Sequence, residues 1–272
     1  MSRLGPVRLV ATDLDGTIVR HDGSVSDRVI EALGAVEDAG LPVVFVTGRP
    51  PRWMAPVVEA TGHRGIAVCA NGALVYDLRS NAVLDRFTLD PEVAGEVVRR
   101  LRERLPGVAF AVERHESYAH EERYRMRWGS PDVATVATAE ELFTEPVAKL
   151  LARDETSSGD AMLAAAREVL GDLVAVTHSN PRDCLLEVSA AGVTKASTLA
   201  LLAGRLGVDA EAVLAFGDQP NDLPMLLWAG HGYAMGGAHP EVVAAVPRRT
   251  GSVDEDGVAV VLEHLLATSR LP

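Results

Sequence analysis

Two short apolar runs near the start of the chain, joined by one helical repeat, limit the possible fold more than any other feature. The first run, 7–12 (VRLVAT), is rich in β-branched residues and ends at an Asp-Gly turn, as is typical of a buried strand in a parallel sheet. Apolar residues then recur at helical spacing over 29–36, and a second apolar run follows at 41–46. A strand, a helix and a strand at this spacing predict a right-handed βαβ unit, so both strands end at the same edge of a parallel sheet.

The same alternation returns in the last third of the chain. A helical pattern over 194–206 precedes an apolar strand at 212–216, and a further helix starts near Leu223. Three later apolar segments can complete such a sheet, namely 233–235, 241–246 and 258–266. The chain is therefore predicted to have an α/β fold with a Rossmann-like parallel-sheet core.

The middle of the chain has a different character. After a third strand at 66–69 and a hairpin at 73–76 and 83–87, strands are predicted at 147–152, 173–177 and 184–188, and helices at 91–105 and 158–170. Residues 113–128 form a charged stretch with interleaved aromatic side chains. Since 272 residues are enough for two domains, we predict a core domain in two parts, 1–80 and 191–272, with a separate α+β domain, 81–190, inserted between them.

Composition and charge argue against several classes of protein. The formal net charge of −12 disfavours polyanionic partners, so we expect no nucleic-acid binding and no binding to membranes. The N-terminal apolar stretch is broken by Arg8 and Asp13, so it is neither a signal peptide nor long enough to span a bilayer. Cys69 and Cys184 lie far apart, and we expect two buried free thiols rather than a disulfide. These features predict a cytoplasmic protein, and they leave open whether it is a monomer or a homodimer.

Four polar clusters follow predicted strands or precede predicted helices: DLDGT at 13–17, TGR at 47–49, Lys195, and GDQPND at 217–222. In an open α/β sheet the ligand site lies outside the carboxyl ends of the strands, so we expect the clusters to converge. Each cluster alone has an ordinary explanation, such as a turn, a loop or a surface lysine. All four in this order, each at the expected end of an element, favour a functional site.

The residue types in these clusters suit phosphoryl transfer. Asp13 and Asp15 are one residue apart and repel each other, which favours a proton or a cation between them. Asp218 and Asp222 add hard oxygen ligands of the kind that Mg²⁺ accepts, and Lys195 adds a positive charge. Phosphoryl transfer depends on positioning the group and neutralising its oxygens, and an aspartate can act as the nucleophile. The clusters therefore predict Mg²⁺-dependent chemistry on a phosphorylated substrate.

Together, the clusters resemble the haloacid dehalogenase superfamily of phosphohydrolases, in the branch with a large α+β (type IIB, Cof-like) cap inserted after the second motif. They match the four motifs of that family in order, and the flanking stretches 69–77, 192–208, 221–230 and 234–246 match as well. The resemblance implies a Mg²⁺-dependent phosphatase that hydrolyses small phosphorylated metabolites, such as a sugar phosphate, a nucleotide or a cofactor phosphate, through an aspartyl-phosphate intermediate.

The resemblance also implies a role for each matching residue. Asp13 would be the nucleophile and a metal ligand, and Asp15 would be the general acid and base and bind the metal through its main-chain carbonyl. Asp218 would be the third protein ligand, while Asn221 and Asp222 would hold the metal's waters and orient Lys195. The residues implied in binding the substrate or its phosphoryl group are Thr47, Gly48, Arg49, Asn71, Gly72 and Lys195.

The inserted domain, 81–190, would be the cap that selects the substrate. It contains a basic and aromatic cluster, namely Arg114, His115, His120, Arg123, Arg125, Arg127 and Trp128. This cluster either contacts the substrate or, as we favour, forms the solvated face of a strand, since its arginines alternate.

Two other functions are compatible with the same sequence. A phosphomutase of the same fold would return the phosphoryl group to the substrate instead of releasing phosphate. A non-catalytic binding protein would be expected to lack the nucleophile or a metal ligand, yet Asp13, Asp15, Lys195 and Asp218 are all present.

Overall fold

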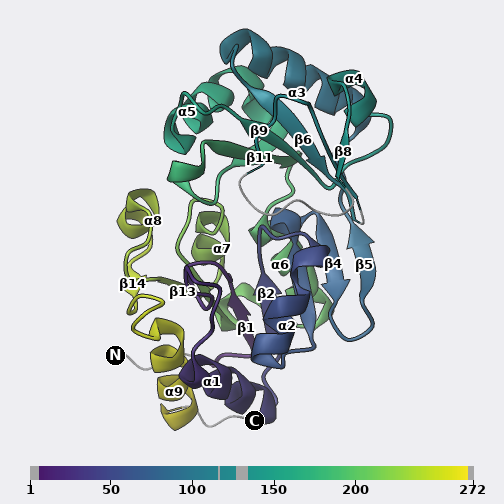
Figure 1. Ribbon diagram of the computed structural model, residues 1–272. Coiled ribbons are helices and arrows are strands. Elements are labelled where there is room, and N and C mark those ends of the chain that lie inside the picture. The colour runs from purple at the N-terminus through teal and green to yellow at the C-terminus, as the bar shows by residue number, and fades with distance from the viewer. Residues whose placement is uncertain (1–5, 116, 127–133, 269–272) are drawn as a thin grey trace. The chain divides into compact units, whose positions relative to one another are not determined.

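The computed structural model describes residues 6–115, 117–126 and 134–268, and the chain divides into two compact units. Unit 1 comprises Met1–Arg49, Trp53–Asp85 and Lys195–Pro272, and unit 2 comprises Pro50–Arg52 and Arg86–Thr194. Each unit has its own sheet (Figure 1). Each also has its own buried apolar residues.

Unit 1 is built, within the described residues, on an eight-stranded sheet in the order β14-β13-β12-β1-β2-β3-β4-β5. The strands are β1 (Leu9–Thr12), β2 (Val43–Val46), β3 (Ile66–Cys69), β4 (Leu74–Asp77), β5 (Ala82–Arg86), β12 (Val213–Gly217), β13 (His231–Ala234) and β14 (Arg248–Arg249). Neighbouring strands from β14 to β3 are parallel, and β4 runs antiparallel to β3. Every residue of β1, β2 and β12 is buried, which explains why these strands are continuously apolar.

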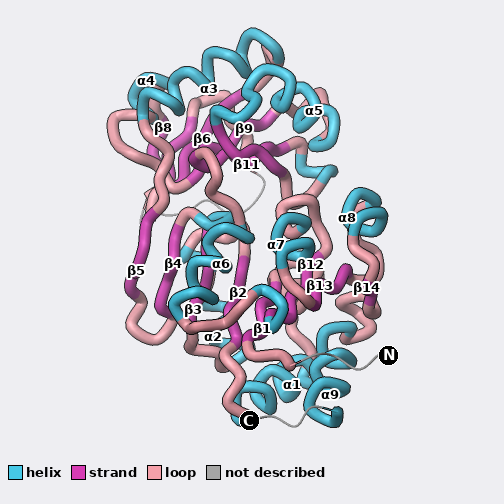
Figure 2. Tube along the Cα trace, turned by 180° about the vertical axis from the view of Figure 1, so that it is seen from behind, coloured by secondary structure: helices cyan, strands magenta, loops and turns pink. Residues whose placement is uncertain are grey.

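Helices cover both faces of this sheet. They are α1 (Asp27–Asp38), α2 (Ala55–Thr61), α6 (Lys195–Arg205), α7 (Leu223–Trp228), α8 (Pro240–Ala245) and α9 (Gly257–Thr268). Helix α1 contacts α9, and α6 contacts α7. The pair α1 and α9 lies on the opposite face from α6 and α7, which come forward when the molecule is seen from behind (Figure 2). This is the arrangement expected of right-handed crossovers that leave the central strand β1 in both directions.

Unit 2 is an α+β structure with a six-stranded sheet, among the described residues, in the order β10-β11-β9-β6-β7-β8. Its strands are β6 (Ala109–Glu113), β7 (Tyr118–His120), β8 (Ala134–Val136), β9 (Lys149–Arg153), β10 (Val174–Thr177) and β11 (Leu185–Ala190), and its helices are α3 (Pro91–Arg104), α4 (Ala139–Leu142) and α5 (Gly159–Leu170). Neighbouring strands are antiparallel, except that β7 and β8 are parallel.

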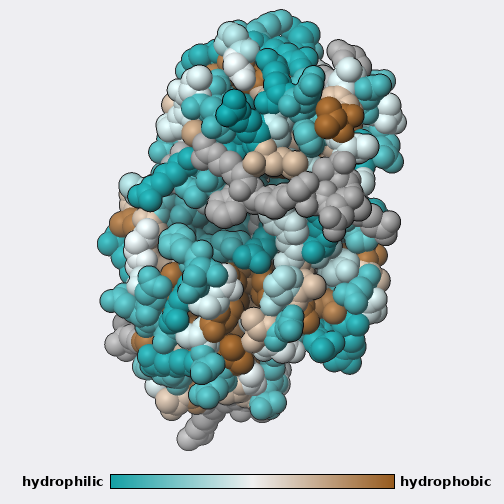
Figure 3. Space-filling view, viewed as in Figure 1, coloured by the Kyte–Doolittle hydropathy of each residue, from teal (hydrophilic) through white to brown (hydrophobic). Residues whose placement is uncertain are grey.

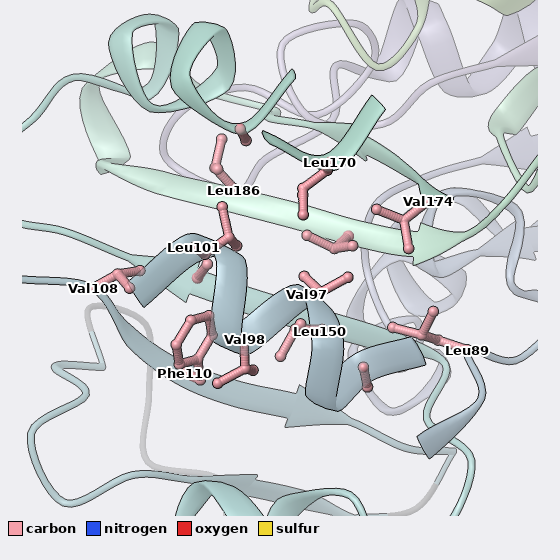
Figure 4. Packing of buried hydrophobic residues seen from close by; sticks show 14 of the residues in the cluster. Leu89, Val97, Val98, Leu101, Val108, Phe110, Leu150, Leu170, Val174 and Leu186 are labelled. Carbon is pink, nitrogen blue, oxygen red and sulfur yellow. The ribbon is translucent and has the colours of Figure 1, made fainter. Parts of the chain in front are cut away.

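The hydrophobic core of unit 2 lies between its sheet and the helices α3 and α5. Val97, Val98 and Leu101 of α3 pack against Phe110 and Leu150 of the sheet (Figure 4). The other side of α3 carries arginine and glutamate side chains, and the surface over this part of unit 2 is hydrophilic (Figure 3). This one-sided pattern is what a helix covering a sheet requires.

The α/β fold class predicted from the sequence is confirmed, with corrections to single elements. Residues 241–246 and 258–266 belong largely to helices α8 and α9 rather than to strands. The alternating arginines do not form a strand in the described part of their segment, because residues 121–126 form a turn and loop. Cys69 is buried as expected and Cys184 is only partly buried, and neither forms a disulfide within the described residues. No described helix is long and apolar enough to cross a membrane.

Candidate active site

Three of the four polar clusters lie where neighbouring parallel strands end, at the same edge of the unit 1 sheet. Asp13 follows β1, Thr47 follows β2 and Asp218 follows β12. Strand β1 lies between the other two in register, with Thr12 opposite Phe45 on one side and Phe216 on the other. The topology therefore brings residues more than 200 positions apart to one place, as the sequence predicted.

Lys195 completes the group from the first position of α6. Its side chain is only 1% exposed, and its Nζ donates to Asp13 Oδ1 and to Asp222 Oδ1, at 2.5 Å each. Burial by itself lowers the pKa of Lys195, but the charges of Asp13 and Asp222 and the two hydrogen bonds raise it above its ordinary value. Lys195 is therefore a buried ammonium held between two carboxylates, and the alternative of a surface lysine is wrong.

Carboxylates outnumber the cations at this site. Asp13, Asp218 and Asp222 each offer an oxygen, and these atoms all lie within 4.8 Å of one another. Burial, and then the neighbouring Asp222, raise the pKa of Asp218 to about 7. Burial and the same neighbour also raise the pKa of Asp13 well above its ordinary value. Buried carboxylates that repel one another and resist ionisation are stabilised by a divalent cation, so this donor set fits Mg²⁺.

The loop that carries Asp218 is held by Asp222. Asp222 Oδ2 accepts from the backbone N–H of Asp218 at 3.0 Å and of Gln219 at 2.9 Å, while its Oδ1 accepts from Lys195. Both carboxylate oxygens of Asp222 therefore already accept hydrogen bonds from the protein, so Asp13 and Asp218 are the better candidates for metal ligands. Gln219 Oε1 and Asn221 Oδ1 are buried acceptors without a hydrogen-bond partner in the part of the chain that the structure describes. These two oxygens belong to the same loop as Asp218 and Asp222, and they are suited to accept hydrogen bonds from water bound to a cation.

Gly16 provides the space that Asp218 occupies. Its φ is +82°, and a Cβ added there would lie 2.6 Å from Asp218 Oδ2. A residue with a side chain at position 16 would therefore adopt a strained backbone and also displace a carboxylate of the cluster.

Asp15 lies at the edge of the site, with 60% of its side chain exposed, and forms a two-point ion pair with Arg49. Arg49 Nε donates to Asp15 Oδ2 at 2.8 Å, and Nη2 donates to Asp15 Oδ1 at 2.5 Å. The sequence predicted Arg49 as a substrate-binding residue but did not predict this ion pair. This ion pair connects the cluster at 13–17 with the cluster at 47–49, and it holds the side chain of Asp15 in one orientation.

The remaining predicted residues surround the loop after β2. Thr47 is buried, and its Oγ1 accepts from the N–H of Arg49 at 3.0 Å, with the half-buried Gly48 between them. Asn71 and Gly72 are buried in a 3₁₀ turn, η2 (Ala70–Gly72), and the N–H of Asn71 donates to the carbonyl of Thr47 at 3.0 Å. Apart from Lys195, which begins helix α6, the described residues that were predicted for the site therefore lie in neighbouring loops and turns of unit 1.

Three members of the basic and aromatic cluster form hydrogen bonds within unit 2. Arg114 donates to the carbonyl of Leu142, and Arg123 donates to the carbonyl of Val108. His120 is buried and its ring nitrogen contacts the carbonyl of Glu121 at 2.8 Å. Arg127 and Trp128 lie outside the described residues.

A second polar group, absent from the sequence predictions, lies on the sheet face of unit 2 that faces away from α3 and α5. Lys149 Nζ donates to Glu187 Oε1 at 2.6 Å, and Arg52 forms a two-point ion pair with Glu113. Lys149, Glu113 and Glu187 are each at most 5% exposed. The signal for them was the even spacing of polar residues, with Lys149 and Arg153 four apart in 149–153 (KLLAR) and Glu187 and Ser189 two apart in 185–190 (LLEVSA), which places each pair on one face of a strand.

Comparison with known proteins gives consistent matches along nearly the whole chain. A family model described as haloacid dehalogenase-like hydrolase matches residues 10–262. A protein named HMP-PP phosphatase, from Enterobacter sp. (strain 638), is 27% identical over 97% of this chain and 98% of its own length. A protein named 5-amino-6-(5-phospho-D-ribitylamino)uracil phosphatase, from Bacillus subtilis (strain 168), is 27% identical over 95% of each chain.

Solved structures resemble the chain over a similar extent. A phosphatase of the haloalkanoate enzyme superfamily from Bacteroides thetaiotaomicron has a TM-score of 0.78 and 25% identity, with 95% of each chain covered. A subclass IIB sugar phosphatase of that superfamily has a TM-score of 0.80 over 95% of this chain and 99% of its own, and at 22% identity it shows the shared fold. The matched part of the chain includes both units.

Proposed function

Because this chain belongs to the haloacid dehalogenase-like hydrolases, we propose that it is a Mg²⁺-dependent phosphatase that hydrolyses small phosphorylated metabolites through an aspartyl phosphate on Asp13. One observation carries the proposal: the ammonium of Lys195 is buried between Asp13 and Asp222, in contact with a carboxylate cluster at the carboxyl ends of parallel strands. A buried cation beside a buried carboxylate is suited to hold a phosphoryl group against that carboxylate.

In the proposed reaction the carboxylate of Asp13 attacks phosphorus, and the bond between phosphorus and the leaving oxygen breaks. Asp15 gives a proton to the leaving oxygen, so that an alcohol departs. Asp15 then takes a proton from water, the water oxygen bonds to phosphorus, and the bond between phosphorus and Asp13 breaks to release phosphate. The exposed side chain of Asp15 can take up this proton from solvent. Because both of its oxygens accept hydrogen bonds from Arg49 in the ion pair, the proton displaces one of those two hydrogen bonds.

Binding of the transferred group would use groups already in place. Thr47, the Gly48 backbone and Lys195 would contact the phosphoryl oxygens. The metal would be held by Asp13, Asp218 and the main-chain carbonyl of Asp15, with Asn221 and Asp222 behind them. When bound, Mg²⁺ neutralises negative charge on the phosphoryl oxygens. We also propose that residues 81–190 act as the cap that selects the leaving group.

The test is release of phosphate with and without Mg²⁺ from an aryl phosphate and from a metabolite panel. The panel includes HMP-PP and 5-amino-6-(5-phospho-D-ribitylamino)uracil, because these are named in the relatives. We expect Mg²⁺-dependent release that Asp13→Asn lowers by about a thousandfold or more. The matched control is Asp38→Asn, since Asp38 is an exposed residue of α1 in the same unit.

Three results would contradict the proposal. Phosphate release that does not need Mg²⁺ would show that the reaction does not use the metal. Full activity in a folded Asp13→Asn variant would show that Asp13 is not the nucleophile. An isomerised product without free phosphate would support a phosphomutase instead.

A further inference from the structure

The three residues after β3 form a turn with a rare backbone conformation. Ala70, Asn71 and Gly72 have φ angles of +52°, +56° and +107°. The left-handed region disfavours residues other than glycine, although asparagine tolerates it better than most, and such residues persist only where the surroundings hold them. The chain therefore maintains an unfavourable conformation at two successive residues of this turn.

Hydrogen bonds tie the turn to the loop after β2. Ala70 N–H donates to the carbonyl of Arg49 at 2.9 Å, and Asn71 N–H donates to the carbonyl of Thr47 at 3.0 Å. On the other side, Thr198 Oγ1, from the helix that begins with Lys195, donates to the carbonyl of Gly72 at 2.8 Å. The left-handed backbone is thus fixed from both directions, next to residues that belong to the proposed site.

The side chain of Asn71 reaches the fourth cluster. Its Oδ1 accepts from Asn221 Nδ2 at 3.1 Å, and the two residues are 3% and 6% exposed. With its amino group committed to Asn71, Asn221 keeps a buried Oδ1 that has no hydrogen-bond partner within the described residues. That oxygen belongs to the loop between Asp218 and Asp222. The hydrogen bond to Asn71 therefore determines which face of the Asn221 amide is left available.

We propose that Asn71 is a positioning residue that acts through Asn221 and through the main chain at Thr47, and does not touch the substrate. This inference rests on the proposed function, in which Asn221 holds water on the metal. It replaces the sequence-based prediction that Asn71 binds substrate, because the hydrogen-bonding groups of Asn71 described above are directed to protein atoms. One residue with both contacts couples the loop that binds the phosphoryl group to the loop that holds the cation.

The test uses Asn71→Gly, which removes the side chain and suits the left-handed backbone. We expect Mg²⁺ to bind about tenfold more weakly by calorimetric titration without substrate, and kcat for an aryl phosphate to fall about tenfold, with KM changed less than twofold. Asn71→Asp keeps an acceptor for Asn221 Nδ2 and tolerates the backbone, so it should recover most of the Mg²⁺ affinity. Asn81→Gly is the matched control, because Asn81 also has a positive φ, +52°, in the turn between β4 and β5.

A double-mutant cycle with Asn221→Ala separates the possible roles. If Asn71 acts through Asn221, the double variant binds Mg²⁺ as tightly as whichever single variant has the lower Mg²⁺ affinity. Asn71→Gly could instead raise KM and leave the Mg²⁺ affinity unchanged, with an effect on KM that adds to the effect of Asn221→Ala. That result would establish a substrate contact and overturn the proposal. Lower thermal stability with unchanged Mg²⁺ affinity and kinetics would also overturn it. A wild type that binds no Mg²⁺ and releases no phosphate would overturn the proposed function itself, whereas an active wild type matched by Asn71→Gly overturns only the positioning role.

Discussion

At the scale of single residues, position 16 is restricted by its own backbone and by the carboxylate of Asp218. Gly16→Ala would require a left-handed alanine and would also place Cβ 2.6 Å from Asp218 Oδ2. We expect a loss of stability of about 1–2 kcal/mol from the backbone, and at least a tenfold loss of phosphatase activity from displacement of Asp218. Thermal unfolding and phosphate release would measure the two effects.

Gly23→Ala is the control for this prediction. Gly23 has a similar φ of +86°, but apart from its chain neighbours no atom of the described residues lies within 4 Å of the position that its Cβ would take. The control should therefore lose similar stability and keep full activity. Equal activities in the two variants would show that Asp218 adapts to the collision.

A second residue-scale prediction concerns His63 and the dependence of stability on pH. Burial lowers the pKa of His63 below its ordinary value of 6.5, although Glu37, whose Oε1 lies 2.9 Å from its Nδ1, opposes this. Below pH 6.5 the unfolded chain takes up a proton at this position before the folded protein does. Stability contributed by the neutral imidazole is therefore present above pH 6.5 and lost as pH falls toward the lower folded pKa.

His63→Gln should flatten this part of the pH profile. The variant will be less stable overall, because His63 packs on Phe45 with ring centroids 4.2 Å apart. The informative quantity is the slope of the free energy of unfolding against pH just below 6.5, measured by urea titration. A slope as steep in the variant as in the wild type would assign the pH dependence to other groups.

The residues brought together at the site were largely predictable from sequence, since Asp13, Thr47 and Asp218 each follow an apolar strand and parallel strands end at one edge. Their partners were not. The ion pair of Arg49 with Asp15 and the hydrogen bond of Asn221 to Asn71 depend on side-chain directions across different loops, which no spacing along the chain encodes.

At the scale of elements, Ser26 links the starts of two helices that are distant in sequence. Its Oγ accepts from the N–H of Val29 in the first turn of α1 at 3.2 Å and donates to Asp256 Oδ1, just before α9, at 2.7 Å. Ser26→Ala should therefore reduce the free energy of unfolding by about 1–2 kcal/mol and leave phosphatase activity unchanged. Chemical denaturation with a parallel activity assay tests this.

Ser158→Ala provides the comparison, because Ser158 caps α5 by accepting from the N–H of Ala161 at 3.3 Å. We expect it to cost less than Ser26→Ala, since only the Ser26 pair includes a second hydrogen bond to another segment. If the two variants lose equal stability, the bond to Asp256 contributes nothing measurable.

Elements with strong local signals were predicted well, whereas a strand without such a signal was missed. Helix α5 begins after the capping residue Ser158 and has a clear apolar repeat. Strand β6, in contrast, was missed, although all of its residues are buried and it pairs with β9 and β7. Its short AFAVE sequence carries no turn chemistry of its own, and its strand conformation is determined by the pairing.

At the scale of the whole molecule, the two units have separate hydrophobic cores, so a core mutation should act on one unit more than on the other. Leu101→Ala in α3 of unit 2 and Leu33→Ala in α1 of unit 1 form a matched pair, at 0% and 2% exposure. Each should cost about 2–5 kcal/mol in its own unit. Hydrogen exchange followed by mass spectrometry would report on each unit separately. Equal loss of protection in both units from either variant would show that they unfold as one.

The pairing of β1 with β12 determines when the reactive part of the protein can be completed during synthesis. Leu9 pairs with Val213, so the strand that leads to Asp13 waits for about 200 residues of translation before its second neighbour exists. At roughly 5–20 residues per second this interval lasts about 10–40 s, and residues 86–194 emerge during it. A chain truncated after Gly207 should therefore resist proteolysis in unit 2 but be cleaved around β1, and it should have no activity. Asp13 is thus synthesised early, whereas β12, the second neighbour of the strand before it, is synthesised about 200 residues later.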